Sequence, residues 1–260
     1  MSNDSTVKTL VVATALCVAC SVLVSTAAVK LKPIQVKNKR LDVKKNLLLA
    51  AGLIESSKAN EKEVNEAYTQ VETKLIDLST GKEVTDMDPA TYDLEKADKD
   101  PELATEIPAD EDIAKIKTRA KVRPVYLVKS GGQVSQIILP FHGKGLWSTM
   151  YGFLSLAPDT QTVKGIGFYQ HGETPGLGGE IDNKKWQANW EGKKVLSENY
   201  KPTIDVIKGS VDSSTPGAES KIDGLSGATL TSNGVEASVN YWVSNEGYGK
   251  FLANFRAGGV

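Results

Sequence analysis

Cysteine is scarce in this chain, and its position excludes a disulfide framework. The 260 residues include only Cys17 and Cys20, both inside an apolar stretch near the N-terminus. A Cys-x-x-Cys pair is compatible with a metal or thiol redox centre, but no further cysteine completes a four-thiolate site. We favour the simpler interpretation, two small side chains in an apolar helix. The rest of the chain contains no thiol and needs no disulfide to fold.

An excess of charge is also missing, since 31 Lys and Arg residues balance 32 Asp and Glu residues. Basic side chains form no stripe interleaved with aromatics, so we expect no nucleic-acid partner. The chain has no Gly-x-Gly-x-x-Gly after a first strand and no lysine of a phosphate-binding loop. A nicotinamide site on this chain is therefore not expected.

The N-terminal stretch predicts a membrane anchor. Thr9 to Val29 is a run of 21 residues without a charge, long enough to cross about 30 Å of hydrocarbon as a helix. A cleaved signal peptide is the alternative, because Ser25-Thr26-Ala27 resembles a cleavage site. The apolar run, however, exceeds the usual core of such a signal. Small residues also recur at four-residue spacing, which suits packing against other membrane helices.

The charges beside this stretch give a first indication of orientation. Lys8 is the only cation before it, whereas seven cations follow closely: Lys30, Lys32, Lys37, Lys39, Arg40, Lys44 and Lys45. The positive-inside rule alone would therefore leave the large domain in the cytoplasm, although the rule is weaker for long translocated domains.

Two kinds of sequence lie between the anchor and residue 120. Apolar spacing over residues 41–78 predicts two helices, interrupted near Ser56-Ser57. Residues 83–112 carry twelve acids and three prolines. They lack the ordered acid spacing of a calcium loop. We interpret this part as a solvated, loosely structured insert.

After residue 120 the pattern changes to strands. Residues 122–128 and 133–141 predict a hairpin around Gly131-Gly132, and strands follow at 154–156, 163–170 and 200–208. Helices are expected over 182–191 and 233–246, the second capped by Thr231 or Ser232. We therefore predict an α+β fold: one N-terminal transmembrane helix, then a soluble domain with an antiparallel sheet and packed helices. The expected divisions are 1–30, 31–120 and 121–260.

The string Asp223-Gly224-Leu225-Ser226-Gly227-Ala228-Thr229-Leu230-Thr231 carries most of the functional information. Small residues permit close approach of a bulky group, and hydroxyls donate hydrogen bonds of the kind that phosphate accepts. A helix follows, whose N-terminus favours an anion. Taken without any resemblance, the hydroxyls are better explained as helix caps.

The same string resembles the Asp-x-x-(Ser/Thr)-Gly-Ala-Thr signature at which bacterial flavin transferases attach FMN. The chain as a whole resembles the C subunit of the bacterial sodium-translocating NADH:quinone oxidoreductases. The apolar N-terminus, Gly145-Leu146-Trp147 and the string from His171 to Gly178 support this, and the match covers the anchor and the part after residue 120. The G subunit of the Rnf electron-transport complex shares the flavin domain and is the nearest competitor.

The resemblance implies FMN joined by a phosphoester to Thr229, with the AMP half of FAD displaced. Asp223 would belong to the motif that the transferase recognises and could help to hold the metal that activates the incoming phosphate; a turn-forming aspartate before Gly224 is the alternative. No residue is assigned to a permanent metal. The turn-forming residues around Pro175 would approach the flavin ring, Trp147 would lie against it, and Lys208 would favour its anionic reduced form. The alternatives are a structural loop, a core tryptophan and a surface lysine. The complete set of expected cofactor contacts is Trp147, Glu173, Thr174, Gly176, Leu177, Gly178, Lys208, Ser226, Gly227, Ala228, Thr229, Leu230 and Thr231.

The function implied by the resemblance is electron relay within a membrane complex. The chain would pass electrons between partner subunits and would not oxidise NADH alone, and no residue acts as an acid–base catalyst. Its soluble domain would lie in the periplasm, at the inner membrane, against the simple charge rule. Its partners would be the other membrane subunits and, during maturation, the flavin transferase. An Rnf-type subunit and a non-redox scaffold are the alternatives.

Overall fold

The computed structural model describes residues 5–56, 58–212 and 214–258. The chain divides into two compact units, one ending at Val43 and the other covering Lys44–Val260. The described part of the first unit belongs to helix α1 (Thr6–Ala50). Among the described residues, α1 alone is long and apolar enough to cross a membrane, judged by length and composition. The predicted apolar run, Thr9 to Val29, lies entirely within it, whereas residues 1–4 of the predicted anchor lie outside the described residues.

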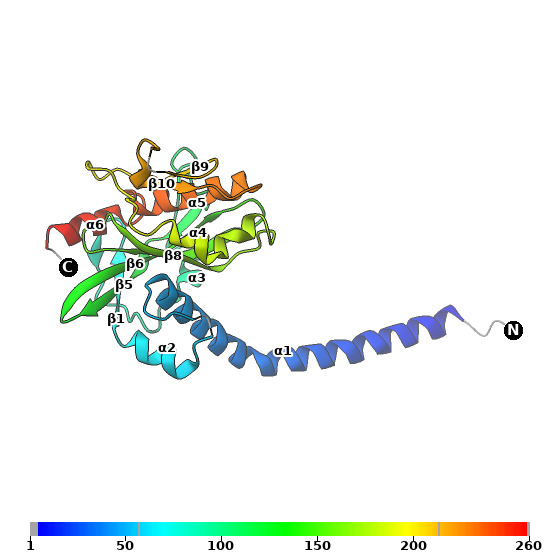
Figure 1. The fold of residues 1–260 in the computed structure, drawn as a ribbon. Helices are drawn as coiled ribbons and strands as arrows, with labels where there is room; N and C mark the ends of the chain where they lie inside the picture. The colour runs from blue at the N-terminus through cyan, green and yellow to red at the C-terminus, as the bar shows by residue number, and fades with distance from the viewer. Residues whose placement is uncertain (1–4, 57, 213, 259–260) are drawn as a thin grey trace. The chain divides into compact units, whose positions relative to one another are not determined.

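The second unit is built on a six-stranded antiparallel sheet with the order β2-β1-β5-β6-β7-β8 (Figure 1). Its strands are β1 (Val71–Asp77), β2 (Lys82–Glu83), β5 (Val122–Ser130), β6 (Gln133–Lys144), β7 (Thr149–Leu156) and β8 (Val163–Gln170). Two small sheets accompany it: β3 (Ala104–Glu106) with β4 (Thr118–Ala120), and β9 (Asp205–Ile207) with β10 (Lys221–Asp223). The predicted α+β class is confirmed.

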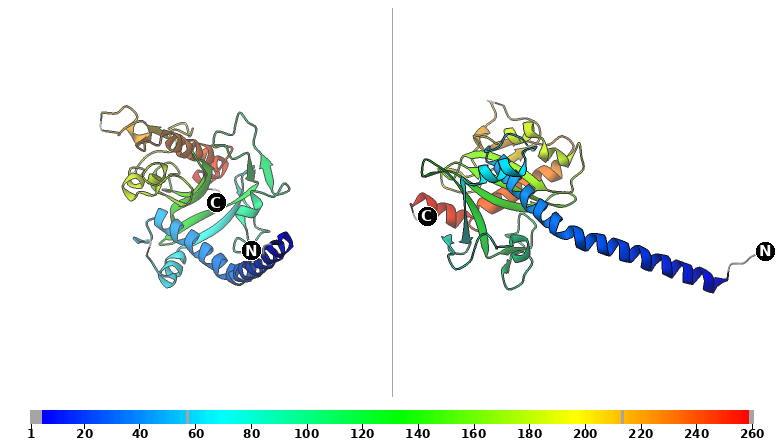
Figure 2. Two further views of the ribbon diagram at one scale, coloured as in Figure 1. Left: turned by 90° about the vertical axis from the view of Figure 1, so that its right-hand side faces the viewer. Right: turned by 90° about the horizontal axis from the view of Figure 1, so that it is seen from below.

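Helices cover the sheet and connect its strands. They are α2 (Glu61–Tyr68), α3 (Leu94–Ala97), α4 (Lys184–Ala188), α5 (Thr229–Val243), α6 (Gly249–Arg256) and two 3₁₀ turns, η1 (Gly178–Asp182) and η2 (Ala218–Ser220). Helix α5 packs on β6 (Figures 1 and 2). Trp242 of α5 and Phe251 of α6 are buried in the main core. The last turn of α1 lies against β8, where Gly165 and Gly167 leave room for Ala50.

The predicted hairpin is present, with Gly131 and Gly132 in the left-handed conformation that such a turn requires. The segment 71–78 is a correction, because it was predicted as helix and forms β1 instead. Leu75 and Ile76 are buried where β1 pairs with β5, so the pairing overrides the helical spacing. The helical segments are separated between Ala50 and Glu61, as predicted, although Ser57 of the predicted break lies outside the described residues. Asn60 caps α2.

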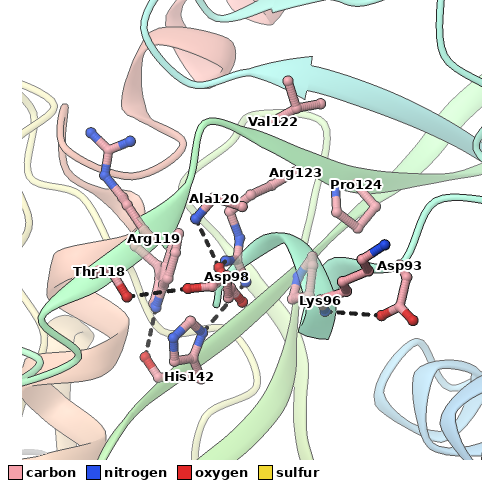
Figure 3. Close-up of polar contacts among 12 residues, drawn as sticks. Asp93, Lys96, Asp98, Thr118, Arg119, Ala120, Val122, Arg123, Pro124 and His142 are labelled. Atoms are coloured by element: carbon pink, nitrogen blue, oxygen red, sulfur yellow. Dashed lines mark hydrogen bonds and ion pairs between the residues drawn. The ribbon is translucent and has the colours of Figure 1, made fainter. Parts of the chain in front are cut away.

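The acidic segment 83–112 is also more ordered than predicted. It contains α3, and its strand β3 pairs with β4. Asp98 lies beside the buried guanidinium of Arg123, at 2.7 Å, and also accepts the N–H of Ala120 (Figure 3). The Arg123 side chain also stacks on Trp242, so one acid of the segment is tied to the core.

Several further elements differ from their predicted bounds. Strands β5, β6 and β7 are longer than the strands predicted over 122–128, 133–141 and 154–156. The strand expected over 200–208 is limited to β9, and the helix expected over 182–191 is the shorter α4 preceded by η1. Helix α5 begins at Thr229, four residues earlier than predicted, and its N-cap is Ala228, which offers no side-chain hydrogen bond. Thr231 and Ser232 are inside the helix and do not cap it. The proposed divisions at residues 30 and 120 remain a prediction.

Candidate functional site

Three loops meet at the beginning of α5. They follow β6 (residues 145–148), β8 (residues 171–178) and β10 (residues 224–228). Gly227 has a φ of 69°, and a Cβ there would lie 3.1 Å from Leu177. At Gly178 a Cβ would overlap the Thr231 hydroxyl. Glycine at these two positions lets the second loop approach the third loop, at Gly227, and the first turn of α5, at Gly178.

The carboxylate of Glu173 holds two of these loops to α5. One oxygen accepts the N–H groups of Trp147 and Ser148 at 3.0 and 3.1 Å. The other accepts the N–H of Leu146 at 3.2 Å and the hydroxyl of Thr231 at 2.6 Å. The Ser148 hydroxyl also donates to this carboxylate, at 3.4 Å. Glu173 is 5% exposed, so a buried charge is satisfied by five protein donors. Glu173 therefore shapes the site by fixing the loops.

The environment of Glu173 keeps this carboxylate ionised. Burial by itself would raise its pKa, but the hydrogen bonds from Thr231 and from the N–H groups of the 146–148 loop outweigh burial and lower the pKa of Glu173 below its ordinary value. His171 supports the same loop. Its Nδ1 accepts the N–H of Glu173 at 3.2 Å, which leaves the proton on Nε2 for Asp182, at 2.8 Å.

A cavity of about 370 Å³ lies beside the first residue of α5. Its two sides are the β9–β10 loop, with Lys208, and the loop before α5, with Ser226 and Thr229. Thr229 is exposed at the N-terminus of a 15-residue helix that no side chain caps. Its hydroxyl is therefore accessible at the position where helix N–H groups favour an anion.

The other two hydroxyls of α5's first turn belong to buried residues that are engaged in hydrogen bonds, although Ser232 also lines the cavity. Thr231 is 1% exposed and donates to Glu173, and Ser232 is buried and accepts the N–H of Leu225 at 3.0 Å. The sequence left Thr229, Thr231 and Ser232 chemically equivalent. In the structure Thr229 alone of the three combines exposure with a position on the cavity.

Large apolar side chains are exposed around the same loops. Trp147 is 67% exposed and Leu230 60% exposed, and Leu146 and Leu177 are also exposed. Exposed apolar groups gathered on loops mark a surface that contacts a ligand or partner. Sequence reasoning identified all of these except Leu146, whose position between Gly145 and Trp147 was the available signal.

The structure separates the expected contacts into two groups. Lys208, Ser226, Gly227 and Thr229 line the cavity. The remainder lie on the loops and the helix start that Glu173 connects: Trp147, Glu173, Thr174, Gly176, Leu177, Gly178, Ala228, Leu230 and Thr231. The cavity lining also includes Gly209, Ser210 and Asn233, which the sequence gave no reason to select.

Comparison with known proteins identifies the class. Residues 145–244 match the FMN-binding domain family, and this range contains the three loops, the cavity and α5. The chain is thus a flavoprotein of the FMN-binding-domain class. The residues suit that cofactor, because an accessible hydroxyl, a helix N-terminus and Lys208 fit a phosphate, and the exposed Trp147 and leucines fit a flat ring.

The particular family follows from whole-chain similarity. The chain is 47% identical over 258 residues to the C subunit of the Na⁺-translocating NADH-quinone reductase of Pseudomonas aeruginosa, covering 99% of this chain and 98% of that protein. It is 48% identical over 260 residues to the corresponding protein of Vibrio vulnificus, covering 100% and 99%. The chain belongs to the family of C subunits of Na⁺-translocating NADH-quinone reductases.

Solved structures agree with this assignment. The crystal structure of NqrC from Shewanella oneidensis superposes with a TM-score of 0.77 at 34% identity, covering 85% of this chain and 99% of that one. The crystal structure of the same type of subunit from Parabacteroides distasonis gives a TM-score of 0.64 at 28% identity, covering 85% and 96%. The family membership decides against the Rnf-type alternative.

Proposed function

We propose that this chain is the electron-carrying C subunit of a membrane sodium-pumping NADH:quinone reductase, with FMN bound covalently through its phosphate to Thr229. The observation that carries the proposal is the position of Thr229, an accessible hydroxyl at the uncapped start of α5 and on the wall of the cavity. Its two hydroxyl neighbours, Thr231 and Ser232, are buried and hydrogen-bonded.

Attachment would use FAD and a flavin transferase. The Thr229 oxygen would form a bond to the phosphorus of the FMN half, and the bond from that phosphorus to the AMP phosphate would break. The threonine proton would pass to a base of the transferase and AMP would leave. The phosphodiester retains one negative charge, which the N-terminus of α5 and Lys208 would stabilise.

The bound FMN would supply reversible electron transfer, and the protein would supply orientation and electrostatics. Trp147, Leu177 and Leu230 would provide apolar contacts to the ring, and the main chain at Gly176 and Gly178 would approach it without side-chain hindrance. Glu173 would hold the loops that carry these groups. The chain would act only together with the other subunits of the complex, since it has no nicotinamide-binding motif of its own.

Location follows from the same assignment. The apolar part of α1 would anchor the chain in the inner membrane, and the soluble domain would lie in the periplasm, where the transferase works. The cations after the anchor argue for the opposite orientation, but partner subunits can fix the topology of a single helix.

The relay is tested in the assembled complex. We would purify the full complex with wild-type chain and with Thr229→Val, and measure NADH oxidation by an artificial acceptor and reduction of quinone separately. Loss of quinone reduction with retained acceptor reduction is expected, because only the electron path through this chain is interrupted. Undiminished quinone reduction by the Thr229→Val complex would contradict the relay, and a scaffold role would then be the better account.

A further inference from the structure

The loop between β9 and the segment leading to β10 forms one side of the cavity at Thr229. Strands β9 and β10 are parallel, with Asp223 opposite Ile207. The chain leaves β9 through Lys208, Gly209 and Ser210, all of which line the cavity. The shape of the cavity therefore depends on what holds this loop in place.

Asp223 contacts both this loop and the segment around α4. One carboxylate oxygen accepts the N–H of Val211 at 2.7 Å, and the other accepts the side-chain amide of Asn189 at 3.3 Å. The carbonyl of Asp223 accepts the indole N–H of Trp186 at 2.8 Å. Asp223 thereby links the end of the cavity loop, the end of β10 and the segment around α4.

The next residue adds a second connection. Gly224 donates its N–H to the carbonyl of Gly209 at 3.0 Å, and a Cβ at Gly224 would overlap the carbonyl of Ile207. The chain just after β10 is therefore in direct contact with the end of β9 and the loop that follows it, and only glycine at position 224 permits so close an approach. Asp223 and Gly224 secure the loop at Val211 and at Gly209, on either side of Ser210.

We propose that Asp223 is a positioning residue, which supports flavin attachment by holding the 208–211 loop against the cavity and does not itself contact the phosphate or a metal. This inference rests on the proposed attachment at Thr229. Both carboxylate oxygens point to donors of this chain. Among the described residues no group of three or more His, Cys, Asp or Glu side chains is arranged to hold a metal. Asp223 is also absent from the cavity lining.

The alternative, a charged contact to a metal or to the transferase, predicts a different response to substitution. Asp223→Asn removes the charge but keeps an oxygen for the N–H of Val211, and its amide can donate to Asn189 once that amide is turned over. Asp223→Ala removes both hydrogen bonds. A positioning role therefore requires Asn to behave like Asp, whereas a charge-dependent role requires Asn to behave like Ala.

The first experiment measures the loop itself in the full chain, purified in detergent and produced without transferase. Amide hydrogen exchange of residues 208–211 should be at least about tenfold faster in Asp223→Ala, because the Val211 N–H loses its acceptor. In Asp223→Asn it should remain within about threefold of wild type. Equal exchange rates in wild type and Asp223→Ala would overturn the inference. This result does not depend on flavin.

The second experiment co-expresses the same chains with a flavin transferase and measures the fraction that gains FMN by intact mass at a fixed time. Wild type and Asp223→Asn should gain similar fractions, and Asp223→Ala at least about tenfold less. Loss of the adduct in Asp223→Asn, with its loop exchange unchanged, would overturn the positioning role and establish a need for the charge. If wild type gains no adduct, the proposed attachment at Thr229 is wrong, and so is a role of Asp223 in attachment. The hydrogen-exchange result still decides whether Asp223 holds the 208–211 loop. If Asp223→Ala does not fold, Asp223→Asn alone still distinguishes a positioning role, which keeps the adduct, from a charge-dependent role, which loses it.

Discussion

The hydroxyl of Thr231 donates a 2.6 Å hydrogen bond to the carboxylate of Glu173, a residue 58 positions earlier in the chain. Both side chains are buried. The same carboxylate accepts three N–H groups of the 146–148 loop, so one charge joins the start of α5 to two loops from the sheet. This pair therefore connects the start of α5 to the loops on which the expected flavin contacts lie.

Replacing Glu173 should destabilise the chain even though it lies at the edge of the domain. Glu173→Gln leaves the Leu146 N–H facing an amide donor, and the free energy of unfolding should fall by about 2 kcal/mol. Chemical denaturation of the detergent-solubilised chain, followed by tryptophan fluorescence, measures it. Glu198→Gln, at an exposed position, is the matched control and should change stability by less than about 0.5 kcal/mol.

The contribution of the hydrogen bond between Glu173 and Thr231 to stability can be measured separately. Thr231→Val should cost about 1–2 kcal/mol in wild type and clearly less in the Glu173→Gln background, because the charged acceptor is already gone. A double-mutant cycle from the same denaturation curves gives the coupling energy. Strictly additive effects would show that the hydrogen bond contributes nothing to stability.

The stability difference between wild type and Glu173→Gln should depend on pH. The folded-state pKa of Glu173 lies below its ordinary value of 4.5 because its hydrogen bonds outweigh burial. A lowered carboxyl pKa gives stability that is complete above the unfolded-state pKa and is lost as pH falls through the folded-state pKa. The difference should therefore be constant between about pH 5 and 7 and decrease below about pH 4.5. If the stability difference between wild type and Glu173→Gln instead increased as the pH falls, the folded-state pKa of Glu173 would not be lowered.

The residues of the candidate site that belong to local motifs could be predicted from the sequence, but the tertiary contacts between them could not. The motif around Thr229 and the loop residues Trp147 and Leu177 could be selected from the sequence, because their resemblance to a family is local in sequence; their contact with the flavin stays a prediction. The partnership of Glu173 with Thr231 was not, since it joins residues 58 positions apart through a tertiary contact. Glu173 was expected to contact the cofactor, which stays a prediction; the hydrogen bonds of its oxygens to Thr231 and to the 146–148 loop were not foreseen.

In the fold, too, elements with a clear local pattern were predicted, and elements that depend on tertiary pairing were not. Alternating residues and a glycine turn identified β5 and β6 from local pattern alone, whereas β1 carried helical spacing and became a strand by pairing with β5. The acidic segment was judged by its composition, which predicts solvation but cannot reveal that Asp98 meets Arg123. Nor can local pattern reveal that Thr231 and Ser232 lie on the buried side of α5.

The contact between Asp98 and Arg123 should be essential to the acidic segment. Arg123 is 1% exposed, so Asp98→Ala leaves a buried cation without its carboxylate and should cost about 3–5 kcal/mol. Limited proteolysis should then cleave within residues 94–121 first. Glu95→Gln, in the exposed pair with Lys99, is the control and should cost less than about 1 kcal/mol. Unchanged cleavage in Asp98→Ala would show that other contacts hold the segment.

Trp147 should affect the flavin and not the fold. Because the indole is 67% exposed, Trp147→Ala should change the free energy of unfolding by less than about 0.5 kcal/mol. Loss of a stacked indole should increase the fluorescence of attached flavin, because indole rings quench flavins on contact. Tyr200→Ala, which removes an exposed ring lying on Arg256, should leave flavin fluorescence unchanged. Equal fluorescence in wild type and Trp147→Ala would exclude the ring contact.

The most direct test of the account is the mass of the full chain after co-expression with a flavin transferase, measured for wild type, Thr229→Val, Thr229→Ser and Thr231→Val. The account predicts a gain equal to FMN minus water in wild type and Thr231→Val, and no gain in Thr229→Val. Thr229→Ser keeps a hydroxyl at the same position and is the matched control for folding. A gain that persists in Thr229→Val would place the bond on another hydroxyl, and the absence of any gain in wild type with an active transferase would contradict covalent flavin attachment altogether.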